Sequence, residues 1–267
     1  IIPNDDVTGF TRNIQEDYVN KDLLFLGTEL GLYITINGGD KWSKFTKNVP
    51  PVAIHYIELQ ANTNDLVMGT HGRGVIIIDD ISPLREINET NLSNKLYFFE
   101  RDEFEIQEFG GFADNFGRET QFIGANSSLS CQIQYLLPRR HTFGKMTMEI
   151  QDMEGNKVTT LNPGKTKGIN TVEWNYNMRT PKIAKGKTLS FGGFTSPTVP
   201  AGKYKVVIKK GRDTFEKTID VTYKNNAGLN EDDRKFQHET VMKLFNMTEE
   251  LAYMVYVIDE LILNKNT

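Results

Sequence analysis

The chain has 267 residues, of which 38% are hydrophobic and 25% charged, and its formal net charge is -4 at pH 7. This composition is typical of a folded globular protein and excludes disordered and collagen-like chains. No apolar run reaches the roughly 20 residues of a membrane-spanning helix, and the negative charge argues against a dedicated nucleic-acid binder. The single cysteine, Cys131, excludes an internal disulfide.

The two ends of the sequence lack the usual signals of a complete protein. The chain begins with Ile1-Ile2-Pro3, without an initiator Met or a secretory signal segment, and it ends within a helical pattern. We therefore expect the sequence to be a fragment of a longer chain.

Residues 1–91 contain a repeat of short apolar runs. Residues 23–28 recur as residues 66–70, so that a Gly-Thr pair returns 42 positions later. Residues 31–34 recur as residues 74–77, one residue out of step. A period of about 40–45 residues built from several short strands is typical of β-propeller blades. We predict two terminal blades here, with the other blades preceding this segment.

Residues 95–225 alternate between apolar and polar side chains, with turn residues such as Gly155 and Gly211 between the runs. The alternation is clearest in five segments: residues 131–137, 146–150, 172–176, 204–208 and 215–223. This pattern predicts about seven half-buried strands in a β-sandwich. Residues 180–200 are rich in Lys, Gly and Pro, which predicts a long surface loop.

Residues 229–267 predict a long helix that begins with Asn230 as its N-cap and acidic residues in its first turn. Six apolar residues then follow at spacings of 3, 4, 3, 4 and 3: Leu244, Met247, Leu251, Met254, Ile258 and Leu261. This narrow seam has to be covered by the sandwich, by a missing helix or by a partner chain. We expect it to pack within its own chain.

Residues 35–42 fit the Asp-box pattern through Thr35, Asn37, Gly39 and Trp42, although Lys41 replaces its second hydroxyl residue. Asn37 can accept hydrogen bonds from backbone N–H groups, and Gly39 can adopt backbone conformations that other residues avoid. Trp42 can bury a large ring. We therefore interpret these four residues as a structural turn without a catalytic role.

This box, with residues 26–32 before it and residues 69–74 and 78–83 after it, resembles the last blades of sortilin-like (BNR, Asp-box) propeller proteins of the large secreted bacterial type. The resemblance implies an Ig-like or fibronectin-like module and a helical segment after the propeller, and a secreted or cell-envelope location. The expected fold is therefore mainly β: terminal propeller blades (1–91), an Ig-like β-sandwich (95–225) and a C-terminal α-helix (229–267).

His71 and Arg73, within the run His71-Gly72-Arg73-Gly74, are the candidate binding residues. The glycines let a ligand approach the backbone closely, and Arg73 could hold a carboxylate, as on a sialic acid or a peptide C-terminus. The alternative, which we expect, is that Arg73 ties down loop carbonyls or pairs with Asp79 or Asp80.

Other patterns do not predict chemistry. Asp79 and Asp80 are adjacent in a strand and point to opposite faces, whereas a glycosidase needs two carboxylates facing one bond. Cys131 lies on an apolar face and is expected to be a core thiol. The four His residues have no metal-ligand spacing: His55, His71, His141 and His238. We therefore expect no catalytic residue, metal or cofactor in this segment.

The sequence favours a non-catalytic binding or scaffolding role that recognises a protein or peptide partner, with a glycan as another partner class. The alternative is a polysaccharide-active glycoside hydrolase, sialidase-like or endoglucanase-like, with its catalytic residues in upstream blades. A third hypothesis is oligomerisation through the C-terminal helix. Neither nucleic acid nor a membrane-spanning segment is expected.

Overall fold

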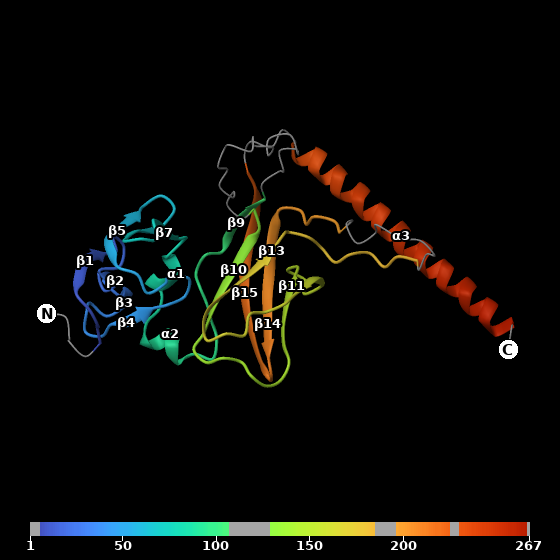
Figure 1. Ribbon diagram of the computed structural model, residues 1–267. Coiled ribbons are helices and arrows are strands. Elements are labelled where there is room, and N and C mark those ends of the chain that lie inside the picture. Colours follow the sequence, from blue (N-terminus) through green and yellow to red (C-terminus); the bar gives the residue numbers. More distant parts are fainter. Residues whose placement is uncertain (1–5, 107–128, 185–195, 225–229, 266–267) are drawn as a thin grey trace. The chain divides into compact units, whose positions relative to one another are not determined.

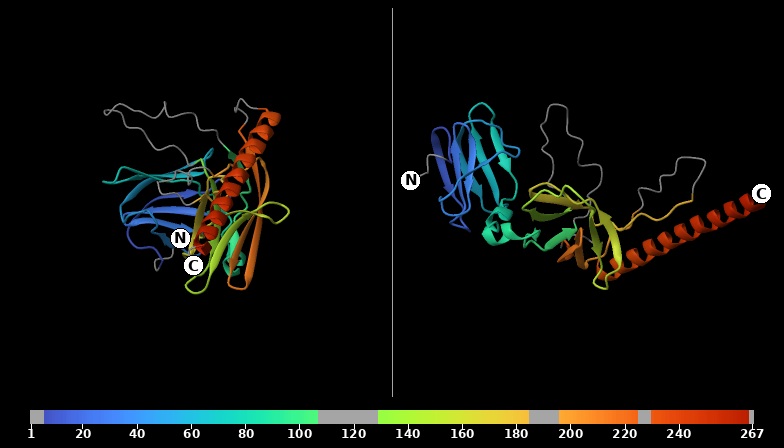
Figure 2. Two further views of the ribbon diagram at one scale, coloured as in Figure 1. Left: turned by 90° about the vertical axis from the view of Figure 1, so that its right-hand side faces the viewer. Right: turned by 90° about the horizontal axis from the view of Figure 1, so that it is seen from below.

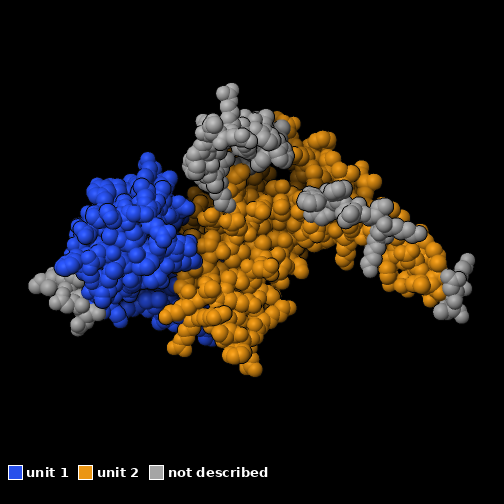
Figure 3. All heavy atoms as spheres, in the orientation of Figure 1, with its two compact units in different colours: residues 1–99, 136–138 blue, residues 100–135, 139–267 orange. Residues whose placement is uncertain are grey.

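The computed structural model describes residues 6–106, 129–184, 196–224 and 230–265 (Figure 1). The protein is mainly β, with several antiparallel sheets and a long C-terminal helix, as the sequence predicts. The chain divides into two compact units, one of residues 1–99 and 136–138 and the other of residues 100–135 and 139–267 (Figure 3).

The first unit contains two antiparallel meanders and two short helices. The first sheet runs in the order β1 (Thr11–Glu16), β2 (Leu24–Thr28), β3 (Gly31–Thr35) and β4 (Ser43–Phe45). The second runs in the order β5 (Ile54–Gln60), β6 (Asp65–Thr70) and β7 (Val75–Ile78). Helices α1 (Ser82–Arg85) and α2 (Glu89–Ser93) follow.

The repeat found in the sequence is confirmed as a repeat of strands. Gly27 in β2 pairs with Asn13 in β1, and Gly69 in β6 pairs with Tyr56 in β5. The first repeat (residues 11–45) and the second repeat (residues 54–78) also share an irregularity, because β1 and β5 both shift register one residue before these pairs. Among the described residues, β4 has no counterpart in the second repeat.

The two sheets of the first unit are stacked on one another (Figure 2). We call the side of each sheet that carries Gly27 or Gly69 its glycine face. A Cβ atom on Gly27 would lie 2.9 Å from the carbonyl oxygen of Ile54, so Gly27 is needed for this close approach. Ile54, Ile57 and Met68 are fully buried on the other face of the second sheet, and this face covers the glycine face of the first sheet. Unlike faces of the two sheets therefore meet, and we call this arrangement head-to-tail packing.

Residues 97–223 supply eight strands among the described residues, against about seven predicted. They are β8 (Tyr97–Phe98), β9 (Glu103–Ile106), β10 (Cys131–Leu137), β11 (Met146–Gln151), β12 (Lys157–Leu161), β13 (Gly168–Trp174), β14 (Gly202–Lys210) and β15 (Asp213–Tyr223). One sheet has the order β13-β10-β8 and the other β12-β11-β14-β15-β9, in which β15 and β9 are parallel.

The core of the second unit lies between its sheets. The rings of Trp174 in β13 and Tyr204 in β14 pack edge to face, with their centroids 5.7 Å apart, and this contact joins the two sheets. The predicted alternation is confirmed in β10, where Cys131 and Tyr135 are fully buried. Tyr176 lies beyond the end of β13, in a left-handed conformation. Part of the predicted loop, residues 185–195, lies outside the described residues.

Helix α3 (Glu231–Lys265) begins as predicted, because the side chain of Asn230 accepts a hydrogen bond from the backbone N–H of Asp233 at 2.8 Å. No described helix is both long enough and apolar enough to cross a membrane. The predicted packing of the apolar seam within its own chain is wrong for the described residues, since its six side chains are 54–60% exposed. Phe245, which is not in the seam, is buried instead.

Candidate functional site

The turn between β2 and β3 shows the basic form of a turn that occurs in both repeats. The hydroxyl of Thr28 donates to the carbonyl of Gly31 at 2.9 Å and accepts from the N–H of Leu30 at 3.1 Å. The N–H of Glu29 donates to the carbonyl of Phe10 at 3.1 Å, which anchors the turn to the start of β1.

The turn between β6 and β7 repeats two of these three contacts with one extra residue. The hydroxyl of Thr70 donates to the carbonyl of Gly74 at 2.7 Å, and the N–H of His71 donates to the carbonyl of Ala53 at 2.9 Å. The extra residue explains why the sequence repeat falls out of step here. It makes room for Arg73 on a turn whose first-repeat equivalent holds only Glu29 and Leu30.

Arg73 is exposed and makes no hydrogen bond or ion pair with the residues that the structure describes. Its neighbours Gly72 and Gly74 have φ values of 86° and 66°, which are left-handed conformations that favour glycine. The expected pairing of Arg73 with Asp79 or Asp80 is therefore not found. The guanidinium group remains open to an external acceptor.

Asp80 does not reach Arg73 because it is used within its own turn. Its carboxylate accepts hydrogen bonds from the backbone N–H of Ser82, at 3.1 Å, and from the Ser82 hydroxyl. Its own N–H donates to the carboxylate of Asp65 at 3.0 Å. These short-range contacts hold Asp80 with a positive φ of 47°. Strand β7 ends at Ile78, so the expectation that Asp79 and Asp80 lie in a strand is wrong.

A second feature of the candidate site was not predicted from the sequence. The register shift in β5 lies between Ile54 and Tyr56, and it brings His55 against His71. The two rings are stacked, with centroids 5.7 Å apart and an angle of 28° between their planes. Both side chains are exposed. We call His55, His71 and Arg73 the β6–β7 site.

Sequence spacing could not reveal the stacked pair, because it depends on cross-strand pairing and on a bulge that redirects a side chain. Among the described residues, no further His, Cys, Asp or Glu side chain joins the two imidazoles to complete a metal site. Within the described ranges, no group of three or more His, Cys, Asp or Glu side chains could hold a metal ion.

The residues of the predicted Asp box form a tight turn between β3 and β4. The hydroxyl of Thr35 donates to the side-chain oxygen of Asn37 at 2.7 Å and accepts from the N–H of Gly39 at 3.2 Å. The same Asn37 oxygen accepts from the N–H of Lys41 at 3.0 Å. The polar atoms of this turn thus bind its own backbone, which is a structural role.

Trp42 ends this turn and packs inward on the face of the first sheet opposite to its glycine face. It is 4% exposed and lies in a cluster with Leu26 and Tyr33. Residues 6–8 cover this cluster: the backbone N–H of Trp42 donates to the carboxylate of Asp6 at 3.2 Å, and the hydroxyls of Tyr33 and Thr8 are 2.7 Å apart.

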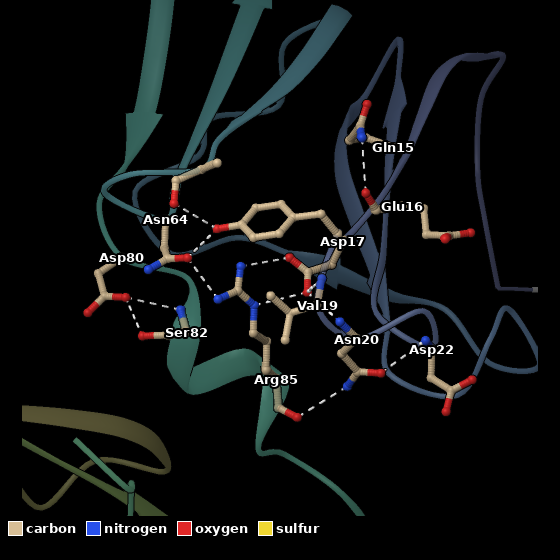
Figure 4. A network of polar contacts seen from close by, with 12 residues as sticks. Gln15, Glu16, Asp17, Val19, Asn20, Asp22, Asn64, Asp80, Ser82 and Arg85 are labelled. Carbon is tan, nitrogen blue, oxygen red and sulfur yellow. Dashed lines mark hydrogen bonds and ion pairs between the residues drawn. The ribbon is translucent and has the colours of Figure 1, made fainter.

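The end of the repeats away from the β6–β7 site is held by a buried ion pair (Figure 4). Asp17 is fully buried, and both of its oxygens accept from the guanidinium of Arg85 at 2.9 Å. Arg85 also donates to the side chain of Asn64 at 2.8 Å. Burial opposes the charge of Arg85, but the hydrogen bonds to Asp17 and Tyr18 outweigh it and raise the pKa of Arg85.

This network of Asp17, Asn64 and Arg85, which we call the clasp, connects the loops of the two repeats. Asp17 follows β1, Asn64 precedes β6, and Arg85 comes from α1, so residues far apart in sequence meet at one point. Asp17 further accepts from the backbone N–H of Asn20 at 2.8 Å. Since these donors and acceptors satisfy one another, the network stabilises the unit and leaves Asp17 without capacity for a ligand.

Cys131 in the second unit is the core thiol that the sequence predicts. It is fully buried, and burial raises its pKa to about 12. Because the thiolate is the reactive form of cysteine, this residue cannot act as a nucleophile at neutral pH.

The fold therefore defines a mainly β protein whose two repeats differ at one exposed turn, the turn between β6 and β7. No protein-family model matches the sequence, and no curated protein is detectably similar to it. The geometry of the β6–β7 site and the stacking of the two repeats are consequently the basis for a functional proposal.

Proposed function

We propose that the chain belongs to a propeller protein of the secreted or cell-envelope type and has a non-catalytic binding or scaffolding role. In this proposal residues 1–91 form two terminal blades, residues 95–225 an Ig-like sandwich that braces them, and residues 229–267 a helical extension. The ligand is a protein or peptide partner that presents a carboxylate. The Asp-box resemblance and two structural observations support the proposal.

The first observation is the head-to-tail packing of the two sheets. A contact between unlike faces can be repeated from sheet to sheet until a ring closes. The glycine face of the second sheet is the exposed one: Tyr56, Val75 and Ile77 are 58%, 64% and 55% exposed. We assign this face to a further sheet of the same kind, as in a propeller.

The same positions in the first repeat show what such a sheet would cover. Leu32 pairs with Gly27 as Val75 pairs with Gly69, and Leu32 is fully buried. Phe25 occupies the position of Val67 and is also fully buried. The apolar character of the second glycine face therefore matches that of a face already covered by a neighbouring sheet.

The second observation carries the binding proposal: Arg73 has no hydrogen-bond or ion-pair partner among the described residues, and it lies on a turn that repeats two contacts of the first one. An arginine guanidinium matches a carboxylate with two parallel hydrogen bonds. The stacked His55 and His71 rings add polar, planar surface beside it. A peptide C-terminus or an acidic side chain is the ligand chemistry that fits this arrangement.

The proposal is tested by affinity capture of the tagged full-length protein from its native envelope, followed by mass spectrometry of what co-purifies. With the captured partner, Arg73→Ala is expected to weaken binding by about 10- to 100-fold, the usual value of a charge-assisted hydrogen bond. Arg12→Ala is the matched control, because Arg12 is an exposed residue at the equivalent bulge of the first repeat.

A second variant replaces residues 71–73 with the Glu-Leu sequence of the first turn, which should preserve the hydrogen bond of the Thr70 hydroxyl while removing His71 and Arg73 from the β6–β7 site. It should lose binding to the same extent as Arg73→Ala. Undiminished binding by both variants would refute the assignment. Recovery of a polysaccharide in place of a protein would favour the glycoside hydrolase alternative.

A further inference from the structure

Helix α3 uses one side to contact its own unit. Phe245 is 6% exposed, and the guanidinium of Arg179 lies 4.7 Å from the centre of its ring. Arg179 also forms a two-pronged ion pair with Glu249, with an Nη2–Oε2 distance of 2.9 Å. Hydrogen bonds from Arg179 and from the backbone N–H of Lys182 hold the pKa of Glu249 to about 2.

The α3 seam, defined as Leu244, Met247, Leu251, Met254, Ile258 and Leu261, lies on the other side of the helix. Met254 follows Phe245 by nine residues, which is about 180° of rotation at 3.6 residues per turn. The side chains of the seam are 54–60% exposed. A molecule bound along the seam would therefore leave the contacts of Phe245 and Glu249 intact.

The spacing of the seam indicates a helix as the occupant. Alternating steps of 3 and 4 residues give a seven-residue repeat, with Leu244, Leu251 and Ile258 at its first position. A seven-residue apolar repeat stays in continuous contact with a second helix when the two helices supercoil around each other. The remaining seam residues, Met247, Met254 and Leu261, occupy its fourth position.

The residues that flank the seam match a second copy of the same helix in parallel orientation. In a parallel pair, each residue before a first position faces the residue five places later in the other helix. Lys243 then faces Thr248 of the second copy and Glu250 faces its Val255, so like charges do not meet. An antiparallel pair would bring Glu250 close to Glu250 of the second copy.

The area of the seam is sufficient for a stable pair. Six large apolar side chains that are 54–60% exposed offer about 600 Å² per helix, or about 1,200 Å² for two helices, which is the lower limit of stable protein interfaces. A continuous apolar patch of this size lies at the upper end of what a monomer surface carries, and such patches often mark interaction sites.

We propose that two copies of this chain associate through a parallel, in-register coiled coil along the α3 seam. The interface is separate from the β6–β7 site. It makes the protein bivalent, so that two binding units would act on one partner assembly with increased avidity.

The mass of the 267-residue chain in solution tests the proposal, by light scattering after size-exclusion chromatography over a range of concentrations. The expected value at high concentration is twice 30.4 kDa. Leu251→Asp should give the monomer mass, while Tyr253→Asp should remain dimeric, because Tyr253 is 68% exposed but outside the seam. Equal circular dichroism spectra of the variants would show that the helix is retained. A monomeric parent chain, or an unaffected Leu251→Asp, would overturn the proposal.

Cysteine cross-linking tests the orientation, with the background thiol Cys131 fully buried. Leu251→Cys should form a covalent dimer on mild oxidation, because a parallel register places the two copies of this residue side by side. Tyr253→Cys is the control and should stay uncoupled. If Leu251→Cys couples only to Met254→Cys in a mixture of the two variants, the helices are antiparallel and the proposed arrangement is wrong.

Discussion

The first and second repeats have the same backbone plan but different surroundings. They share three strands, a register shift at the same point and a threonine that closes the turn after the second strand. In the first repeat the glycine face is covered by the second sheet, and Asp17, the acidic residue that follows β1, is buried. In the second repeat the corresponding face, turn and loop are exposed.

The difference shows where each repeat has been specialised. Residues that maintain the shared backbone structure, such as Gly27 and Gly69 or Thr28 and Thr70, are the same in both repeats. Residues that contact a neighbouring segment or the solvent differ between the repeats. Arg73 and the His55–His71 pair belong to the second group, which is why we place binding there. Matched substitutions at equivalent positions can test this distinction directly.

The largest effect on stability is expected at Asp17, the residue that follows β1. Asp17→Ala leaves Arg85 partly buried without its partner, and removal of one member of a buried ion pair costs about 3 kcal/mol. Gln60 is the equivalent residue, and its exposed side chain accepts from the N–H of Thr63 at 2.8 Å. Gln60→Ala should cost less than about 0.5 kcal/mol, as is usual at the surface.

Hydrogen exchange of the β1 and β2 amides measures this local stability without interference from the second unit. Faster exchange in Asp17→Ala than in Gln60→Ala is the expected result. Similar rates in the two variants would show that the clasp does not distinguish the repeats.

The next effect is expected at the paired glycines. Gly27→Ala places a Cβ atom 2.9 Å from the carbonyl oxygen of Ile54, and overpacking of this kind costs about 2 kcal/mol. A Cβ atom on Gly69 meets only Tyr56, at 3.6 Å, so Gly69→Ala should be neutral or stabilise by up to about 0.5 kcal/mol.

Urea unfolding curves of this chain provide the comparison for the two glycine variants. Equal destabilisation by both would contradict the head-to-tail packing of the sheets. If the proposed further sheet covers the second glycine face in a longer chain, Gly69→Ala should be destabilising there.

The smallest effect is expected at the turn threonines. Thr28 is fully buried, so Thr28→Val leaves the Gly31 carbonyl and the Leu30 N–H without a partner, at a cost of about 1 kcal/mol. Thr70 is only partly buried, and water can replace its hydroxyl in Thr70→Val. The melting temperature of each variant, compared with that of the parent chain, measures the difference. A larger loss in Thr70→Val would mean that the second turn is the more tightly enclosed one.

Much of the local structure could be predicted because it depends on neighbouring residues. Strand alternation predicted β10, β11 and β14, and the side chain of Asn230 predicted the start of α3. Thr35 and Asn37 predicted a turn that hydrogen-bonds to its own backbone. In the turn and the helix cap the partners are within a few positions of each other, and strand alternation repeats every second residue, so the local pattern of residues contains the information.

The chain order of residues was sufficient for the repeat, the strands and the helix, since these follow from side-chain period and short-range hydrogen bonds. It was insufficient for Asp17 with Arg85, for His55 with His71 and for the exposed side of α3. Those features depend on which surfaces meet when distant segments pack. An apolar period shows that a face can be buried, but only three-dimensional packing determines which face a neighbour covers.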